Sequence, residues 1–264
     1  MGAPEEPHAR KMGRAVVVLA LSAGCAPAPT TIAGATTSWS AREVAPSRAP
    51  TTAEWRAGLD RLNAIRREAA IARTARIALE LTEPRSGRRL AARGAVAVAP
   101  PRALRMILLG PGGTTALDLW MSGDRYRFAV PAIDLDKRGA LTSPRAERRG
   151  LPVDFLGWWL LRPAAGELLH HARVSRADRF VLRDGSAIVD LVVGDDGRVD
   201  ARRTTWVGSE RVDEETVRAD RLGCGEVRYH QGSTMLDVIV RCEGETQGEP
   251  KERALADPSG EGGS

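Results

Sequence analysis

The chain has 264 residues, three cysteines and a formal net charge of +5, and apolar and charged residues make up 42% and 28% of it. These values exclude a collagen-like chain, a small disulfide scaffold and a wholly disordered protein. The length allows one large domain or two small ones. No apolar stretch reaches about 18 residues, so the sequence offers no candidate transmembrane helix.

The first 24 residues have the pattern of a secretory signal. The basic residues Arg10, Lys11 and Arg14 precede the apolar run 15–21, and small residues follow up to Cys25. A basic segment, a short apolar run and small residues are typical of an export signal. Residues 1–11 are long and acidic for the basic segment, so Met1 and Met12 both stay open as the start.

The cysteine that follows Ala23-Gly24 makes this segment resemble the signal of bacterial lipoproteins, in which the thiol is lipidated and becomes the mature N-terminus. The resemblance implies palmitate or similar acyl chains on Cys25, and Ala26 favours the outer membrane. Ser22 departs from the pattern, because leucine is usual three residues before the cysteine. An ordinary signal peptide or a buried N-terminal strand is the alternative.

Composition divides the rest of the chain. Residues 25–50 are rich in Ala, Pro, Ser and Thr and predict a flexible, lipidated tether. Residues 243–264 combine acidic residues with repeated glycine and predict a disordered acidic tail. The folded domain is therefore expected over 51–242.

The domain is predicted to begin with a long helix and to continue as strands. Thr51 and Glu54 have the spacing of a capping box, and apolar residues then recur at helical spacing from Trp55 to Ala69. From Arg76 onward the apolar residues alternate instead. This pattern predicts antiparallel strands, joined by turns that contain glycine or proline, over residues 76–82, 89–98, 104–108, 117–121 and 126–130.

A second helix is predicted over 151–161, between Pro152 and Pro163. It is apolar nearly all round, so it must be buried or contact an apolar partner. Strands resume at Arg179, with hairpin signals at Asp184-Gly185 and 195–197, and continue to 242. The sequence thus predicts a mainly β domain of about ten or eleven antiparallel strands, one long N-terminal helix and one short inserted helix.

Four features in chain order resemble the LolA/LolB-like superfamily, and its LolB branch most. They are the helix start Trp55-Arg56 with Leu62-Asn63, the strand 93–97, the strand–turn–strand stretch 102–119 and the helix 151–161. The resemblance implies an incomplete antiparallel β-barrel, with both helices over its open side and an apolar cavity for acyl chains. It also implies a monomeric outer-membrane lipoprotein that faces the periplasm and takes part in lipoprotein or lipid transfer, with a LolA-like carrier as a candidate partner.

The turn 110–113 departs from that family pattern. In the LolB branch this turn exposes a leucine that engages the membrane, whereas the sequence here is Gly110-Pro111-Gly112, and Gly112 stands where that leucine would be. Glycine provides no apolar wedge for a membrane. A membrane role for this turn is therefore in doubt.

The expected cavity is lined by strand residues and covered by helix residues. The lining comprises Leu104, Met106, Leu117, Leu119 and Phe128, and the cover comprises Trp55, Leu59, Phe155 and Trp159. Hiding roughly 300–400 Å² of acyl chain from water contributes about 8–10 kcal/mol, so binding would need no catalytic group. The alternative is that these residues fill a core and that the domain is a non-enzymatic periplasmic interaction module.

Cys224 and Cys242 flank a predicted hairpin, and a periplasmic location would permit a disulfide between them. A three-residue turn at 232–234 would place the two cysteines opposite each other. Strict alternation puts their side chains on opposite faces, unless a bulge at Gly223 or Gly225 turns one of them. The pairing therefore stays open.

Other chemical signals are weak. His170-His171 are adjacent and lack further metal ligands nearby, so no metal or cofactor is predicted. The run 110–115 lacks the lysine of a phosphate-binding loop, and no Gly-x-Ser-x-Gly motif is present, so we expect no enzyme. Arginine-rich strands without interleaved Phe or Tyr do not favour nucleic acid as a partner.

Overall fold

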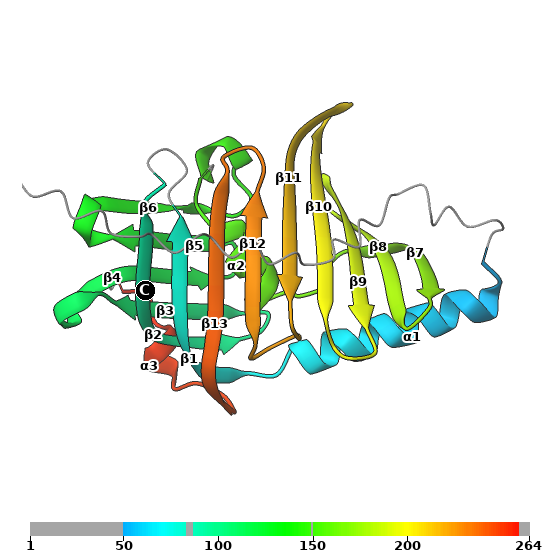
Figure 1. The fold of residues 1–264 in the computed structure, drawn as a ribbon, viewed down its shortest axis with the longest axis horizontal. Helices are drawn as coiled ribbons and strands as arrows, with labels where there is room; N and C mark the ends of the chain where they lie inside the picture. The colour runs from blue at the N-terminus through cyan, green and yellow to red at the C-terminus, as the bar shows by residue number, and fades with distance from the viewer. Residues whose placement is uncertain (1–49, 83–86, 149, 259–264) are drawn as a thin grey trace, which may run out of the picture. The chain divides into compact units, whose positions relative to one another are not determined.

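The computed structural model describes residues 50–82, 87–148 and 150–258 (Figure 1). The predicted signal peptide 1–24, the predicted lipidation site Cys25 and the tether up to residue 49 lie outside the described residues. Within the described part of the chain, no helix combines the length and the apolar character that crossing a membrane requires.

The described residues form thirteen strands, three α-helices and three short 3-10 helices. The helices are α1 (Thr52–Ala69), α2 (Val153–Leu160), α3 (Glu252–Leu255), η1 (Pro111–Gly113), η2 (Pro131–Ile133) and η3 (Arg145–Arg148). The strands are β1 (Arg73–Thr82), β2 (Arg89–Ala99), β3 (Ala103–Leu109), β4 (Thr115–Ser122), β5 (Arg125–Val130), β6 (Leu135–Ala140), β7 (Glu167–Val174), β8 (Ala177–Asp184), β9 (Ala187–Gly194), β10 (Val199–Val207), β11 (Glu210–Ala219), β12 (Glu226–Gln231) and β13 (Leu236–Gln247).

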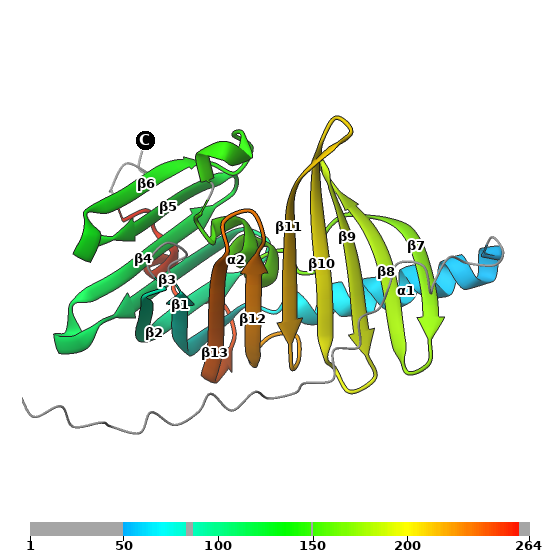
Figure 2. The same cartoon turned by 45° about the horizontal axis from the view of Figure 1, so that its top comes forward.

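All thirteen strands belong to one antiparallel sheet. Their order is β6-β5-β4-β3-β2-β1-β13-β12-β11-β10-β9-β8-β7, so β1 pairs with β13 in the interior and β6 and β7 are the two edges (Figures 1 and 2). Every other neighbouring pair is joined by a short connection along the chain, as hairpins require. The edges do not pair with each other, so the predicted incomplete antiparallel barrel is confirmed.

The sequence predicts about ten or eleven strands and misses β6 and β7 of the thirteen. β6 has the sequence Leu-Asp-Lys-Arg-Gly-Ala, which shows no apolar alternation because this edge strand is almost wholly exposed. Its pairing with β5 depends on backbone hydrogen bonds and on ion pairs such as that between Arg127 and Asp136. β7 contains a register shift between Leu168 and His170, and such a bulge interrupts alternation.

The predicted capping box starts α1. Thr51 Oγ1 accepts a hydrogen bond from the Glu54 amide at 3.3 Å, and the Thr51 amide donates to Glu54 Oε2 at 2.7 Å. One face of α1 buries Leu62 and Ile65, and α1 packs against β7. At that contact Gly58 leaves room for His171, because a Cβ on residue 58 would lie 2.6 Å from the His171 ring.

The two faces of the sheet differ in chemistry. The inner face carries the alternating buried residues, such as Leu104 and Met106 of β3 and Val238 of β13, and α2 packs on it. The outer face carries a ladder of charges in which Asp118 lies between Arg105 and Arg127. The hydrophobic core therefore lies on the inner face, as the period-two pattern predicts.

The C-terminal boundary differs from the predicted one. β13 continues to Gln247, five residues past 242, because residues 244–247 pair with the start of β1. Arg73 and Arg93 offset the charges of Glu245 and Glu243 on that extension. Residues 248–258, here called the C-terminal strap, then fold on the outer face of β2 and β3, where Leu255 O accepts a hydrogen bond from Trp120 Nε1 at 2.9 Å. Composition alone does not reveal this pairing.

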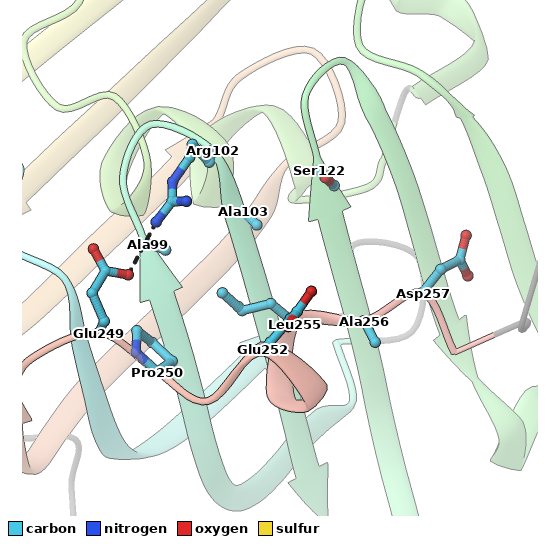
Figure 3. A pocket seen from close by; sticks show the side chains of 10 residues that line it. All are labelled: Ala99, Arg102, Ala103, Ser122, Glu249, Pro250, Glu252, Leu255, Ala256 and Asp257. Carbon is cyan, nitrogen blue, oxygen red and sulfur yellow. Dashed lines mark hydrogen bonds and ion pairs between the residues drawn. The ribbon is translucent and has the colours of Figure 1, made fainter. Parts of the chain in front are cut away.

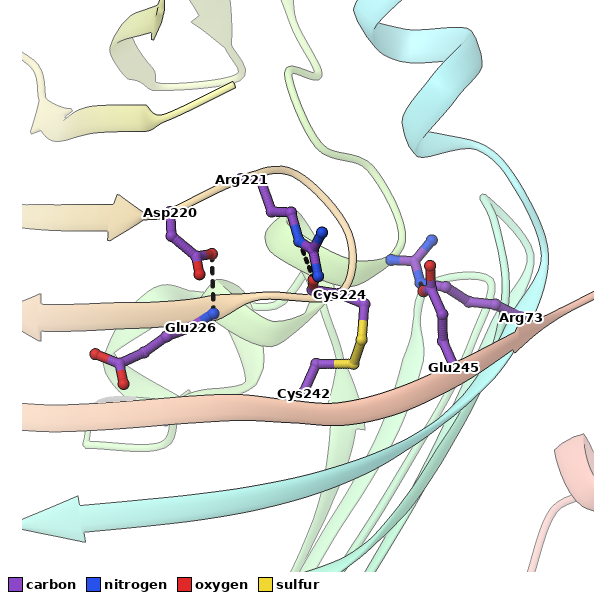
Figure 4. The surroundings of a disulfide bond; sticks show 7 residues. All are labelled: Arg73, Asp220, Arg221, Cys224, Glu226, Cys242 and Glu245. Carbon is purple, nitrogen blue, oxygen red and sulfur yellow. Dashed lines mark hydrogen bonds and ion pairs between the residues drawn. A yellow bond between two sulfur atoms is a disulfide. The ribbon is translucent and has the colours of Figure 1, made fainter. Parts of the chain in front are cut away.

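Cys224 and Cys242 form a disulfide (Figure 4). Cys224 precedes β12 by two residues, so the alternation of that strand does not fix the direction of its side chain. The loop is held on both sides, since Arg221 Nε donates to the Cys224 carbonyl and the Glu226 amide donates to Asp220. The loop geometry thus removes the conflict over opposite faces that the sequence left open.

Candidate functional site

The short helix α2 lies on the inner face and touches both halves of the sheet. The ring of Phe155 stacks on Tyr229 of β12 with 4.2 Å between centroids. On its other side, Gly157 sits so close to β4 that a Cβ there would lie 2.8 Å from Met121 Cε. Every residue of α2 except Asp154 is buried. The helix therefore occupies the middle of the curved inner face.

Polar contacts hold the N-terminal end of α2. The buried Arg148 makes an ion pair with Asp154 at 3.0 Å and donates hydrogen bonds to the carbonyls of Ser143 and Ala140. Pro152 stands at the N-cap, and no side chain of the described residues caps the helix there. One arginine thus ties the helix to the segment that follows β6, while the remaining contacts of α2 are mainly apolar.

The structure brings the predicted cavity residues together. Seven of them are buried in one apolar cluster: Leu104, Met106, Leu117, Leu119, Phe128, Phe155 and Trp159. Trp55 and Leu59 of α1 are partly buried and pack against that cluster. α2 supplies two of the buried side chains, Phe155 and Trp159, so in this conformation it fills the inner face instead of only covering it.

A small cavity is lined by residues of α2 and of strands β10–β12. Its volume is about 10 Å³, which is room for no more than one water molecule. Phe155, Trp158, Arg203 and Glu215 are among its lining residues. Trp158 Nε1 and Arg203 Nε are buried with no hydrogen-bond partner among the described residues.

A row of polar side chains continues along the inner face from this cavity. Glu215 accepts hydrogen bonds from Tyr229 Oη at 2.6 Å and from Arg203 Nη1 at 3.1 Å. Beside it, Asp213 accepts a hydrogen bond from Gln231 Nε2 at 2.9 Å. The sequence interpretation missed this row. Asp213 and Glu215 share the strand phase of Val217 and Ala219, and a carboxylate in an apolar phase is a signal for a buried polar site.

A second polar cluster holds α1 on the sheet. The buried Asp178 accepts contacts from Arg61 of α1, His171 of β7 and Arg173, each at 3.0–3.1 Å. Arg66 donates to the carbonyls of two residues that precede β7, and burial lowers its pKa. These contacts fix the position of α1, whose partly buried Trp55 and Leu59 border the core.

The larger hollows lie on the outer face, beside the C-terminal strap. One has a volume of about 690 Å³ and lies between the β2–β3 turn and the strap, where Arg102 and Glu249 pair at 3.0 Å (Figure 3). Another, of about 380 Å³, lies over β5 and β6 near Trp120. Both are open grooves with charged rims, and none of the nine predicted cavity residues lines either of them.

The other positions that the sequence singled out are the turn 110–112 and the pair His170-His171. The turn Gly110-Pro111-Gly112 begins η1, and Gly112 adopts φ +79°, so glycine suits the backbone there. His170 and His171 point to opposite sides, since His171 contacts Asp178 whereas Arg179 and Asp190 influence His170. No cluster of three or more His, Cys, Asp or Glu side chains suited to a metal ion occurs within the described ranges.

The sequence matches no protein-family model and no curated protein. The similar solved structures include a LolA superfamily protein from Nitrosomonas europaea, a Vibrio parahaemolyticus domain provisionally described as an outer membrane lipoprotein-sorting protein, and a DUF1329 family protein from Desulfovibrio piger. Their sequence identities are 12%, 10% and 10%, and their TM-scores are 0.48, 0.40 and 0.37. The matches cover 76%, 74% and 77% of this chain and 97%, 94% and 97% of the respective structures. LolA superfamily proteins are thus among the structures that this chain resembles, and similarity at this level carries no conclusion about function.

Proposed function

We propose that the chain is a non-catalytic, lipid-anchored carrier that binds acyl chains on the inner face of its open sheet and acts in lipoprotein or lipid transfer. The anchor is a lipid on Cys25, and the domain faces the periplasm from the outer membrane. Expected partners are the membrane and the acyl chains of a lipid or lipoprotein, received directly or from a LolA-like carrier. The protein acts as a monomer.

The observation that supports this proposal most is the nature of α2. A helix of eight residues with only one residue outside the core is an apolar rod, and the sheet contacts it from two sides. An acyl chain is also an apolar rod, although it is thinner than a helix with its side chains. The inner face is therefore a surface that already holds an occupant of the chemistry we propose, contributed by the chain itself.

Binding requires α2 to move. In the proposed bound state the acyl chain lies on the inner face, and α2 shifts outward and lies over it. The apolar side chains of α2 then contact the ligand instead of the strands, so little apolar surface is left in water. Each buried CH₂ of the ligand contributes about 0.8 kcal/mol, which offsets the contacts that α2 gives up.

The test is a titration of the full chain carrying Cys25→Ser with a fluorescent fatty acid. The substitution removes the protein's own lipid, so any binding reports on the domain. We expect saturable binding at micromolar concentration or below. A matched pair of samples tests the role of α2: the variant Gly157→Cys/Met121→Cys, in the Cys25→Ser background, before and after its two thiols are bridged by a short bis-maleimide, which forms one sulfur–carbon bond with each thiol. These positions are adjacent, as the 2.8 Å approach shows.

The unbridged variant should bind the fatty acid, and the bridged variant should bind at least tenfold more weakly. Near-ultraviolet circular dichroism of both samples would verify that they are folded. Equal binding by the two would show that the ligand does not use the space under α2. Absence of binding to every form of the protein would contradict the proposal.

A filled core favours a second candidate function. The seven buried residues predicted for the cavity pack tightly in this conformation, and the cavity beside α2 admits at most one water molecule. On this alternative the domain is a non-enzymatic periplasmic interaction module, and its surface carries the function. A partner protein recovered with the chain after chemical cross-linking in cells, together with no fatty-acid binding, would support it.

A further inference from the structure

The hairpin between β10 and β11 extends beyond its neighbours in the sheet (Figures 1 and 2). The ladder between β10 and β9 ends at Thr205, and the ladder between β11 and β12 begins at Glu215. Residues 206–214, here called the arm, therefore have ladder partners only within the β10–β11 hairpin, and near its tip Trp206 pairs with Arg211 and Val207 with Glu210.

The base of the arm is held in place. The Trp206 amide donates to the carbonyl of Ser186 in the β8–β9 turn at 3.1 Å. On the other side, the amides of Gly232 and Ser233 in the β12–β13 turn donate to the Glu214 carbonyl and to Asp213 Oδ1. Hydrogen bonds to the turns on both sides fix the direction of the arm, while its tip stands free of the sheet.

The tip exposes large apolar side chains. Trp206 is 39% exposed and Val207 is 67% exposed, and Val212 is exposed beside them. Met235, in the neighbouring β12–β13 turn at the same end of the strands, is 62% exposed. Exposed apolar side chains at the same end of neighbouring strands form a candidate contact site.

We propose that this arm is a membrane-contact element, which inserts Trp206 and Val207 into the interfacial layer of a phospholipid bilayer. Tryptophan has an apolar ring and an N–H donor, so it favours the boundary between headgroups and acyl chains. Glu210 and Arg211 lie opposite Val207 and Trp206 and bring one charge of each sign to the tip. That pairing matches headgroups that carry both a phosphate and an amine.

The size of the patch favours a bilayer over a protein partner. The four exposed side chains together offer a few hundred Å², whereas a stable protein interface buries about 800 Å² on each partner. A bilayer places no such demand on a protruding tip, because the tip is surrounded by lipid once it enters the interface.

The inference needs no ligand on the inner face. It uses the proposed function only in that a lipid on Cys25 would keep the domain near a membrane. The 26 residues from Cys25 to Pro50 span at most about 90 Å when extended, which is long enough for the arm to reach the bilayer in several orientations.

The test places an environment-sensitive fluorophore at the tip. The full chain with Cys25→Ser and Val207→Cys is labelled with a nitrobenzoxadiazole dye, since the other two cysteines form a disulfide. The matched control is Ile133→Cys in η2, because Ile133 is also 67% exposed but lies far from the arm in sequence. Each labelled protein is mixed with vesicles of phosphatidylethanolamine and phosphatidylglycerol, with and without lipids that carry a doxyl quencher on the acyl chain.

We expect vesicles to shift the emission of the dye at 207 to shorter wavelength and doxyl lipids to quench it, with little change at 133. Adding Trp206→Ser should reduce the response at 207 severalfold. Equal responses at 207 and 133 would overturn the proposal, and so would a shift that appears without vesicles as the protein concentration rises, since that result indicates self-association. No fatty acid is present, so the outcome is independent of the acyl-binding titration.

Discussion

Phe155 of α2 stacks on Tyr229 of β12, with ring planes only 11° apart, and Tyr229 in turn donates its hydroxyl hydrogen bond to the buried Glu215. A single tyrosine thus joins the apolar contact that docks α2 to the polar row that crosses the inner face. The two functions of its ring and its hydroxyl can be separated by substitution.

Truncating the ring on α2 should weaken its docking. We predict that Phe155→Ala lowers the free energy of unfolding by about 3–5 kcal/mol, because a buried aromatic side chain is lost. If α2 competes with the ligand for the inner face, the same variant should bind a fatty acid severalfold more tightly than the parent. Urea unfolding and fluorescence titration measure the two effects.

The control for this variant is Leu182→Ala, which removes a fully buried side chain from β8 and should cost about 2–5 kcal/mol of stability. It should leave the affinity for fatty acid unchanged. Tighter binding in both variants would mean that general loosening of the core, and not release of α2, controls access.

Removing only the hydroxyl of Tyr229 should weaken the polar row, because Glu215 then loses the hydrogen bond from Tyr229. We predict that Tyr229→Phe keeps the stack with Phe155 and lowers the free energy of unfolding by about 1–3 kcal/mol, because the buried Glu215 loses a hydrogen bond. Urea unfolding would measure this loss, and no gain in fatty-acid affinity should accompany it. An unchanged stability would show that another group replaces the hydroxyl.

Reduction of the disulfide should destabilise the domain without changing its fold. Cys224 and Cys242 are 18 residues apart, and opening a loop of this size costs about 3 kcal/mol in the chain-entropy description. Urea unfolding with and without a thiol reductant measures the difference. The variant Cys224→Ser/Cys242→Ser should be as stable as the reduced parent, with and without the reductant. An unchanged stability of the parent on reduction would refute the assignment.

Stability should fall in mild acid, in part through His170. Burial, together with the charges of Arg179 and His171, holds the pKa of His170 below its ordinary value of 6.5, and Asp190 opposes this shift only weakly. Below about pH 6.5 the unfolded chain therefore binds a proton at this position before the folded chain does, so acid favours unfolding. Above that pH the residue contributes no pH dependence.

The corresponding variant is His170→Gln. Between pH 7 and pH 5.5 its free energy of unfolding should decline less steeply than that of the parent, as measured by urea titration at each pH. Carboxylates contribute equally to both proteins, so the difference isolates His170. Identical slopes would show that His170 takes up its proton equally in the folded and unfolded states.

The sequence predicts the inner face better than the edges of the sheet. Leu104 and Met106 of β3 alternate with Arg105, and this local period is enough to place them in the core. β6 has no such period, because both of its faces are exposed and its pairing with β5 is set by the backbone. The extension of β13 past residue 242 is likewise invisible locally, since it depends on β1, which lies far away in the sequence.

In the candidate site, too, local sequence patterns predict some features, whereas contacts between distant segments determine the others. An apolar helix over 151–161 could be predicted from its composition, but not whether it covers a cavity or fills it, because that depends on how closely Gly157 approaches Met121. The polar row depends on the pairing register of the strands, which places Glu215 directly opposite Arg203 and Gln231. A single sequence does not show this register. The exposure of Trp206 likewise follows from where the ladders of neighbouring strands end.

The central claim is that an acyl chain takes the place of α2 on the inner face. Hydrogen exchange followed by mass spectrometry, on the full chain carrying Cys25→Ser with and without a saturating fatty acid, measures this directly. Our account predicts that the amides of residues 153–160 exchange faster when the fatty acid is bound, while those of β3, β4 and β12 exchange more slowly. Slower or unchanged exchange in residues 153–160 with the fatty acid bound would contradict it.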